Sequence, residues 1–248
     1  MKKLGVLAAL VSVSFLAAMG QNQNSVFLMH NQNVVEWTDT AEYDAMVDSI
    51  AIPVLKSLVR DSLILGWGFT DHAWGDEWNK NWWMITTSHS AFLTAWSEMI
   101  SRTNADFPGS LAIFAKLNKR HKDDFYVVRD WNSSGQPSGA LMVQQNVVKA
   151  GMMGDWNSFM KEKSAPILEE LLQEGVLHAY GNLNHAWGSE WNGGFYLAAQ
   201  NVDGVLAAWR AFTSRMTERH PGWFSEGVKV IDIHKDNIYS IRVQNEVN

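Results

Sequence analysis

Residues 71–79 read Asp-His-Ala-Trp-Gly-Asp-Glu-Trp-Asn, and residues 184–192 read Asn-His-Ala-Trp-Gly-Ser-Glu-Trp-Asn. Seven of these nine positions are identical. The separation along the chain between His72 and His185 is the repeat spacing, and two residues separated by it are called equivalent. The same spacing aligns other matches without a gap: Gln32-Asn33-Val34-Val35 with Gln145-Asn146-Val147-Val148, Pro53 with Pro166, Ser101-Arg102 with Ser214-Arg215, and His121-Lys122-Asp123 with His234-Lys235-Asp236. So many matches at one spacing predict that a single module was duplicated and fused.

The repeat sets the expected domain boundaries. One module covers residues 26–130 and the other covers residues 139–246, and the polar stretch 131–138, which contains Gly and Pro, is the predicted linker. Two copies are too few for a solenoid. A fused pair that imitates a symmetric homodimer is the more natural arrangement.

Hydrophobic spacing gives the elements of each module, and the second copy is the easier to interpret. Residues 141–148 are rich in β-branched side chains and predict a strand, followed by an apolar helical stripe from Trp156 to Leu172 that contains Pro166. Two further strands are expected at 176–183 and 191–200, then a helix through Trp209, and a last strand at about 228–243. The predicted fold class is α+β, with two ferredoxin-like β-α-β-β-α-β modules.

This plan resembles the dimeric α/β-barrel superfamily of the NIPSNAP, EthD and stress-responsive barrel type, here as a fused tandem repeat. The resemblance rests on the element order, on the proline-bearing helix Ser164-Ala165-Pro166-Ile167-Leu168 running into Gly175, and on the fusion itself. It implies a pseudo-dimeric barrel. Such families include cofactor-free monooxygenases, haem-handling enzymes, isomerases and proteins without known activity, and none of their catalytic motifs is present in this chain.

The N-terminus has the pattern of a secretory signal peptide over residues 1–20. Lys2 and Lys3 precede an apolar stretch from Leu4 to Ala18, and small residues then predict cleavage before Gln21. The apolar stretch is shorter than the roughly 20 residues of a spanning helix. We therefore expect an exported protein, periplasmic or extracellular, with no membrane span after cleavage.

The amino-acid composition limits the classes of molecule that the protein is expected to bind. The net charge is −6 without a basic stripe, which disfavours nucleic acid and favours a small molecule. The chain has no Cys, so its stability must come from a buried core. Composition leaves the oligomeric state open.

The repeated hairpin motif supplies the candidate catalytic residues His72, Glu77, His185 and Glu190. Alternation along a strand would place His72 on the face of Gly68 and Trp74, and His185 on the face of Gly181 and Trp187. There an imidazole and a carboxylate could bind a ligand or move a proton. The predicted ligand-binding residues are Trp74, Trp78, Asn79, Trp187, Trp191 and Asn192, since indole rings suit a flat or apolar ligand. The alternative is a structural hairpin in which the aromatic residues fill the core.

His121 and His234 are weaker candidates, as metal ligands. The resemblance to fused barrels implies that the last strand of one module lies near the second strand of the other, which would bring His121 toward His185 and His234 toward His72. Two His and one Glu match the ligands of Zn or non-haem iron. A solvated turn is the competing interpretation, and no motif requires a cofactor, whether haem or a divalent metal.

Two functional hypotheses follow. One is a small-molecule-binding or catalytic protein of the cell envelope, oxygenase- or isomerase-like, acting on an apolar or aromatic substrate. The other is a non-enzymatic structural or interaction module. Phosphate-binding loops, nucleophile elbows and reactive Cys are absent from the sequence, which disfavours nucleotide-dependent and covalent acyl-transfer chemistry.

Overall fold

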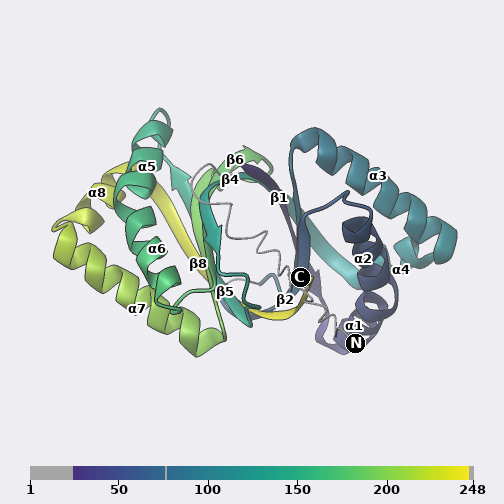
Figure 1. The fold of residues 1–248 in the computed structure, drawn as a ribbon. Helices are drawn as coiled ribbons and strands as arrows, with labels where there is room; N and C mark the ends of the chain where they lie inside the picture. The colour runs from purple at the N-terminus through teal and green to yellow at the C-terminus, as the bar shows by residue number, and fades with distance from the viewer. Residues whose placement is uncertain (1–24, 76, 246–248) are drawn as a thin grey trace, which may run out of the picture.

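A computed structural model describes residues 25–75 and 77–245. Its strands form one closed barrel in the order β1-β3-β2-β8-β5-β7-β6-β4, and every pairing is antiparallel. Helices cover the outside of the barrel in two separate layers (Figure 1). The predicted signal peptide lies outside the described residues.

The elements of residues 26–133, here the first half, recur in the same order in residues 140–244, the second half. The first half contains β1 Val26–Val35, α1 Thr40–Met46, η2 Val47–Ala51, α2 Ile52–Arg60, β2 Gly66–Trp74, β3 Lys80–Thr86, α3 His89–Asp106, α4 Ser110–Leu117 and β4 Asn118–Ser133, with a short 3-10 turn at Trp37–Asp39. The second half contains β5 Ala140–Val148, α5 Met153–Phe159, η3 Met160–Ser164, α6 Ala165–Gln173, β6 Ala179–Trp187, β7 Gly193–Ala199, α7 Val202–Arg219, α8 Trp223–Val230 and β8 Ile231–Gln244.

The last strand of each half leaves its own sheet edge to pair with the other half. β4 pairs with β1 and also with β6, and β8 pairs with β5 and also with β2. The barrel therefore closes only when both halves are present. The α+β class and the closed barrel agree with the prediction, and the pseudo-dimer of two ferredoxin-like modules stays a prediction.

Local sequence explains the helices. Ser88 and Asn201, which are equivalent at the repeat spacing, cap α3 and α7 by accepting bonds from the amides of Ala91 and Gly204. Pro53 and Pro166 stand in the first turn of α2 and α6. Each proline follows one turn of π-helix, so the helical segment continues through it with a bulge.

Two details of the sequence interpretation were wrong. The stretch after α7 forms the short helix α8 before β8 starts at Ile231, so the last strand begins later than residue 228; α4 is its counterpart in the first half. β4 also extends to Ser133, through the first part of the predicted linker.

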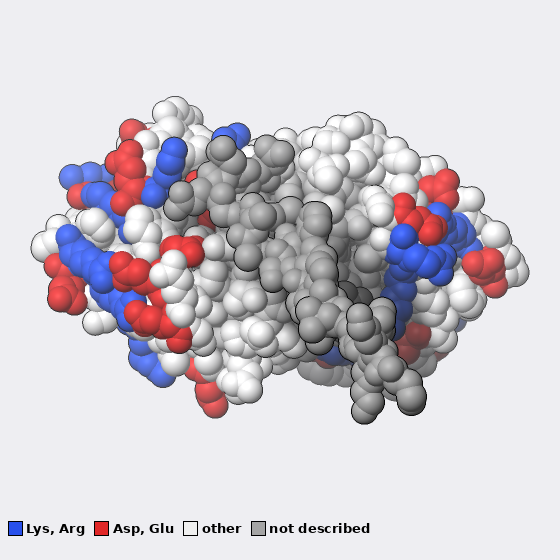
Figure 2. All heavy atoms as spheres, viewed as in Figure 1, with Lys and Arg blue, Asp and Glu red and all other residues white. Residues whose placement is uncertain are grey.

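Three apolar clusters hold the structure together. One packs the helices of the second half on their sheet, and the second does so for the first half. The third lies inside the barrel and draws on both halves, with Val26, Tyr126, Val128, Val143, Leu183 and Tyr239 as its buried members. Charged side chains gather over the helices at the two ends of the molecule (Figure 2).

Candidate functional site in the barrel interior

One end of the barrel interior is polar. Alternation places one face of each strand inward, and the pairing register identifies a row of neighbours across three strands. Gln32 of β1 pairs with Asn81 of β3, which pairs with Thr70 of β2. His72 lies two residues beyond Thr70 on the same inward face, opposite Tyr239 of β8.

This polar row carries buried atoms without hydrogen-bond partners. Among the described residues they are Gln32 Oε1, Thr70 Oγ1, His72 Nε2 and Asn81 Oδ1. Gln32, Thr70 and Asn81 are each at most 2% exposed, and His72 is half-buried. Buried polar atoms in native proteins almost always have a protein, water or ligand partner. Four such atoms lie on this one inner wall, where water or a ligand would be needed to supply their partners.

The equivalent wall of the second half lacks most of this polarity. At the repeat spacing, Leu183 stands for Thr70, Gly194 for Asn81, and Val143 for His30. Only His185 and Gln145 keep the residue types of His72 and Gln32. The barrel interior thus presents one polar wall, built from the first half.

An ionisable pair stands beside this wall. His30 and Asp124 are directly opposite on β1 and β4, and both are buried. Asp124 Oδ1 accepts hydrogen bonds from the Ser189 amide at 2.9 Å and from the Ser189 hydroxyl at 2.5 Å, while Gln32 Nε2 donates to Oδ2 at 3.2 Å. Burial alone would raise the pKa of Asp124. The Ser189 bonds, the nearby Lys122 ammonium and His30 outweigh burial and hold the pKa below its ordinary value.

The interior network continues through aromatic hydroxyls. Gln145 Nε2 donates to Tyr126 Oη at 3.2 Å, and Asn237 Nδ2 donates to Gln145 Oε1 at 3.2 Å. Burial, followed by the charge of Asp124, raises the pKa of Tyr126, so its hydroxyl stays protonated at neutral pH. The His30 ring meets the Tyr239 ring edge-on, with 6.1 Å between centroids. His30 and His72 therefore both lie next to Tyr239.

The predicted catalytic residues do not form a single cluster. His72 faces inward, half-buried, whereas His185 is exposed, opposite Tyr126. Glu77 and Glu190 are both exposed, and Glu77 lies 3.5 Å from Arg120. The structure thus places His72 at the polar wall and both glutamates at the surface, and a catalytic role for any of the four stays a prediction.

The assignment of Trp74 and Trp187 to the histidine face was wrong. A β-bulge between His72 and Trp74, and another between His185 and Trp187, inserts one extra residue and turns the tryptophan to the outer face. There Trp187 packs on Phe125, with 5.0 Å between ring centroids. Trp74 is 56% exposed. Simple alternation cannot foresee a bulge.

The other motif residues have structural contacts. Asn79 bonds both backbone groups of Val35, at 2.9 and 2.7 Å, and Asn192 does the same with Val148, at 2.6 and 2.9 Å. These bonds account for the asparagine in both copies. Ligand binding by Asn79 and Asn192 stays a prediction.

Cations from the last strand of each half lie over the remaining two indoles. Arg120 and Lys122 lie over Trp78 at 5.3 and 5.4 Å from its ring centroid, and Lys235 lies 5.8 Å from that of Trp191. Trp191 is buried and Trp78 is half-buried. These contacts give both tryptophans a packing role, and their predicted ligand contact is untested.

The motif glycine also has a structural cause. Gly188 adopts φ +129°, and a Cβ there would lie 2.6 Å from the Asp123 carbonyl oxygen and 2.9 Å from Asp124 Oδ1. Only glycine lets this turn approach closely enough for the Ser189 amide to reach Asp124.

The expected approach of His121 to His185 and of His234 to His72 does not occur. The predicted strand pairs form, but their register places Tyr126 opposite His185 and Tyr239 opposite His72, each further along its strand than the candidate histidine. His234 instead bonds Asn146 and Asp236, both at 2.9 Å, and the Asp236 carboxylate raises its pKa. Within residues 25–75 and 77–245, no group of three His, Cys, Asp or Glu side chains is placed to hold a metal.

A haem does not fit the described residues either. A hollow of about 270 Å³ outside the barrel is lined, among the described residues, by no His, Tyr, Cys or Met. We therefore derive no chemistry from haem.

Sequence reasoning missed Gln32, Thr70, Asn81, His30 and Asp124 because it followed identities between the copies. Except for Gln32, these residues are marked instead by positions at which the two halves differ. Asp124 corresponds to Asn237 and His30 to Val143, so this buried His–Asp pair has no counterpart in the second half.

Comparison with known proteins addresses the fold. A candidate monooxygenase from Lactobacillus acidophilus superposes with a TM-score of 0.62 at 7% identity, covering 90% of this chain and 97% of that one. The likeness spans the α+β fold with its closed antiparallel barrel. An anthrone oxidase-like protein matches with a TM-score of 0.52 at 11% identity over 91% and 94% of the two chains. A heme-binding protein from Thermus thermophilus matches at 0.52 and 13% identity over 88% and 92%.

At these identities the likeness concerns the fold alone. No protein-family model matches the sequence, and no curated protein does.

Proposed function

We propose that this protein binds a small aromatic molecule bearing hydroxyl groups at the polar wall of the barrel, and acts on it as an oxygenase- or isomerase-like enzyme. The observation that carries the proposal is the set of four unpartnered buried atoms on one wall. Two of these, the amide oxygens of Gln32 and Asn81, only accept hydrogen bonds, so they select for donor groups such as hydroxyls. Trp83 and Tyr239 supply aromatic surface on the inner face.

His72 is the proposed acid–base group. Its Nε2 has no partner among the described residues, so in its neutral form the imidazole can take a proton from a substrate carbon next to a carbonyl. Return of the proton to another carbon completes an isomerisation. With O2 as co-substrate, a CH2 group becomes a carbonyl, and the second oxygen atom leaves with both hydrogens as water. Structural neighbours described as a candidate monooxygenase and as anthrone oxidase-like support the oxygenase branch.

His72→Gln is the direct test, with His185→Gln as its matched control at the equivalent, exposed position. Titration of the intact protein with catechol and naphthol, followed by tryptophan fluorescence, should show saturable quenching. His72→Gln should weaken that quenching about tenfold, the effect of losing one good hydrogen bond in a dry site. His185→Gln should leave it unchanged. Equal effects of the two substitutions would contradict the assignment.

The Thr70→Leu variant distinguishes a ligand-binding role of the Thr70 hydroxyl from a structural role. Leucine stands at the equivalent position 183, and replacement of an unpaired buried hydroxyl by an apolar side chain is neutral or stabilising. We expect the variant to unfold at the same or a higher denaturant concentration than wild type and to lose the quenching. A destabilised variant that still binds would favour a structural polar wall.

The second candidate function is a non-enzymatic structural or interaction module. It is supported by the motif asparagines, whose side-chain amides bond the backbone. Absence of tryptophan quenching by every hydroxylated aromatic compound in the titration would favour this second function.

Export belongs to the same proposal. Within the described residues no helix is long and apolar enough to cross a membrane. The sequence pattern of residues 1–20 supports secretion with cleavage near Gln21. Intact mass spectrometry of protein purified from the producing cell should give a chain beginning within a few residues of Gln21. A mass that includes Lys2 and Lys3 would contradict the proposed export.

A further inference from the structure

Two arginines occupy equivalent places on the outer surface of the barrel. Arg129 lies near the end of β4 and Arg242 near the end of β8, and the repeat spacing maps one onto the other. Each arginine stands at a β-bulge. In β4 the bulge follows Arg129 and ends at Asn132, and in β8 it follows Ile241. Their surroundings differ, and the difference creates a hollow in one place only.

Around Arg242 the space is closed by ion pairs. Arg242 Nη2 donates to Asp48 Oδ2 at 2.6 Å, and Arg242 Nε lies 3.8 Å from Asp44 Oδ1. Lys80 Nζ bonds the same Asp44, at 2.8 and 2.9 Å, and Asp71 at 2.8 Å. Three carboxylates thus surround two cations, and no room for a ligand is left among them.

Around Arg129 the carboxylates have been replaced. At the repeat spacing, Asn157 stands for Asp44 and Lys161 for Asp48. Within residues 25–75 and 77–245, neither Arg129 nor Lys161 forms an ion pair. A second cation therefore stands where the first half supplies the anion that neutralises its arginine.

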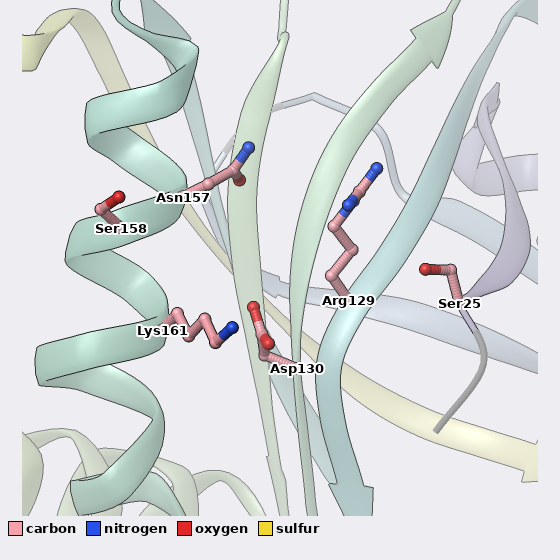
Figure 3. A pocket seen from close by; sticks show the side chains of 6 residues that line it. All are labelled: Ser25, Arg129, Asp130, Asn157, Ser158 and Lys161. Atoms are coloured by element: carbon pink, nitrogen blue, oxygen red, sulfur yellow. The ribbon is translucent and has the colours of Figure 1, made fainter. Parts of the chain in front are cut away.

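The result is a hollow of about 270 Å³ at the junction of the two halves, lined by Ser25, Arg129, Asp130, Asn157, Ser158 and Lys161. In Figure 3, Asn157 and Lys161 reach from the helical segment α5–η3 toward β4, which supplies Arg129 and Asp130, and Ser25 lies just before β1. Asp130 adopts φ +44°, a conformation that Asp tolerates better than most residues. The lining carries two positive charges against one negative.

A buried amide behind the hollow is only partly satisfied. Asn182 is 1% exposed and pairs with Arg129 across the strands. Its Nδ2 reaches Asn157 Oδ1 at a long 3.5 Å, and its Oδ1 has no partner among the described residues. Rotation of Asn157 toward a ligand would therefore cost little in hydrogen bonding.

We propose that this hollow binds the oxyanion group of a small organic acid, a carboxylate or a phosphate monoester. Guanidinium groups match the geometry of such oxyanions, and Lys161 adds a second positive charge. Ser158 and Asn157 can hydrogen-bond the rest of the molecule. The volume is just below the roughly 300–1,000 Å³ of typical ligand pockets, which suits a small acid. The site lies outside the barrel, separate from the polar wall.

The test is calorimetric titration of the intact protein with inorganic phosphate and, separately, with citrate, at constant ionic strength. Lys161→Asp recreates the arginine–aspartate pair of the other half, so it should close the hollow and weaken binding of the preferred anion about tenfold or more. Lys116→Asp, the same charge change on α4, should have no effect beyond a factor of about two, as expected for a screened distant charge. Tighter binding of phosphate would identify a phosphoryl ligand, and tighter binding of citrate a carboxylic acid.

Two outcomes would overturn the proposal: no measurable binding of either anion, or binding that Lys161→Asp and Lys116→Asp weaken equally. Unfolding of the variants should be followed in parallel, because Lys161→Asp is expected to keep or raise the midpoint. His72→Gln should leave anion binding unchanged, so failure of the polar wall and failure of this hollow can be told apart.

Discussion

Asp124→Ala should lower the free energy of unfolding by about 3 kcal/mol or more, the range for removing one partner of a buried charge network. Asp124 is fully buried and accepts bonds from Gln32 and from both donors of Ser189. Lys122 lies 3.5 Å from its carboxylate. Removal of the carboxylate takes this acceptor from the Gln32 amide and from both donors of Ser189. Urea unfolding followed by circular dichroism measures the loss.

Asp124→Asn is the matched control, because asparagine stands at the equivalent position 237. There Asn237 donates to Gln145 Oε1, whereas Gln32 donates to Asp124. In the variant a rotated Gln32 amide would present its unpartnered Oε1 to the new amide group. We therefore expect a loss of about 1 kcal/mol, much smaller than for alanine. Equal losses for the two variants would show that burial of the carboxylate, rather than its bonds, decides the stability.

We also expect the stability difference between wild type and Asp124→Asn to depend on pH. The folded-state pKa of Asp124 lies below its ordinary value of 3.8, so its contribution to stability is present above that value. It is lost as the pH falls through the folded-state pKa. The difference in unfolding free energy between wild type and Asp124→Asn should therefore be constant at neutral pH and shrink below pH 3.8. A constant difference down to strongly acidic pH would contradict the depressed pKa.

Sequence reasoning reached the fold through one long-range signal. The repeated motif at residues 71–79 and 184–192 implied two equal modules, and hydrophobic spacing then gave the order of the main elements. The short helices α4 and α8 escaped because each is a two-turn segment running directly into a strand. An apolar stretch of that length fits a helix or a strand equally well.

The site was harder to predict, for two physical reasons. Bulges after His72 and His185 move the neighbouring tryptophans to the opposite face, and one extra residue is invisible in an alternating pattern. A residue present in both copies can also serve a structural contact, as the Asn79 bond to the Val35 backbone and the close turn at Gly188 illustrate. A site that only one half carries is marked instead by positions where the halves differ, and His30 and Thr70 are of this kind.

The largest effect should follow from separating the halves. A fragment of residues 136–248 would leave β6 without β4 and β8 without β2, so two strand edges would lose their hydrogen-bond partners. It would also expose the interior cluster, in which Val143, Leu183 and Tyr239 pack with Tyr126 and other residues of the first half. This loss is comparable with the whole stability of a domain, about 5–15 kcal/mol. We expect the fragment to be unfolded or to pair with a second copy, and co-expression with residues 25–135 to restore the barrel. Sedimentation and thermal unfolding of the fragment decide the matter, and a monomer that unfolds cooperatively would contradict the shared interior.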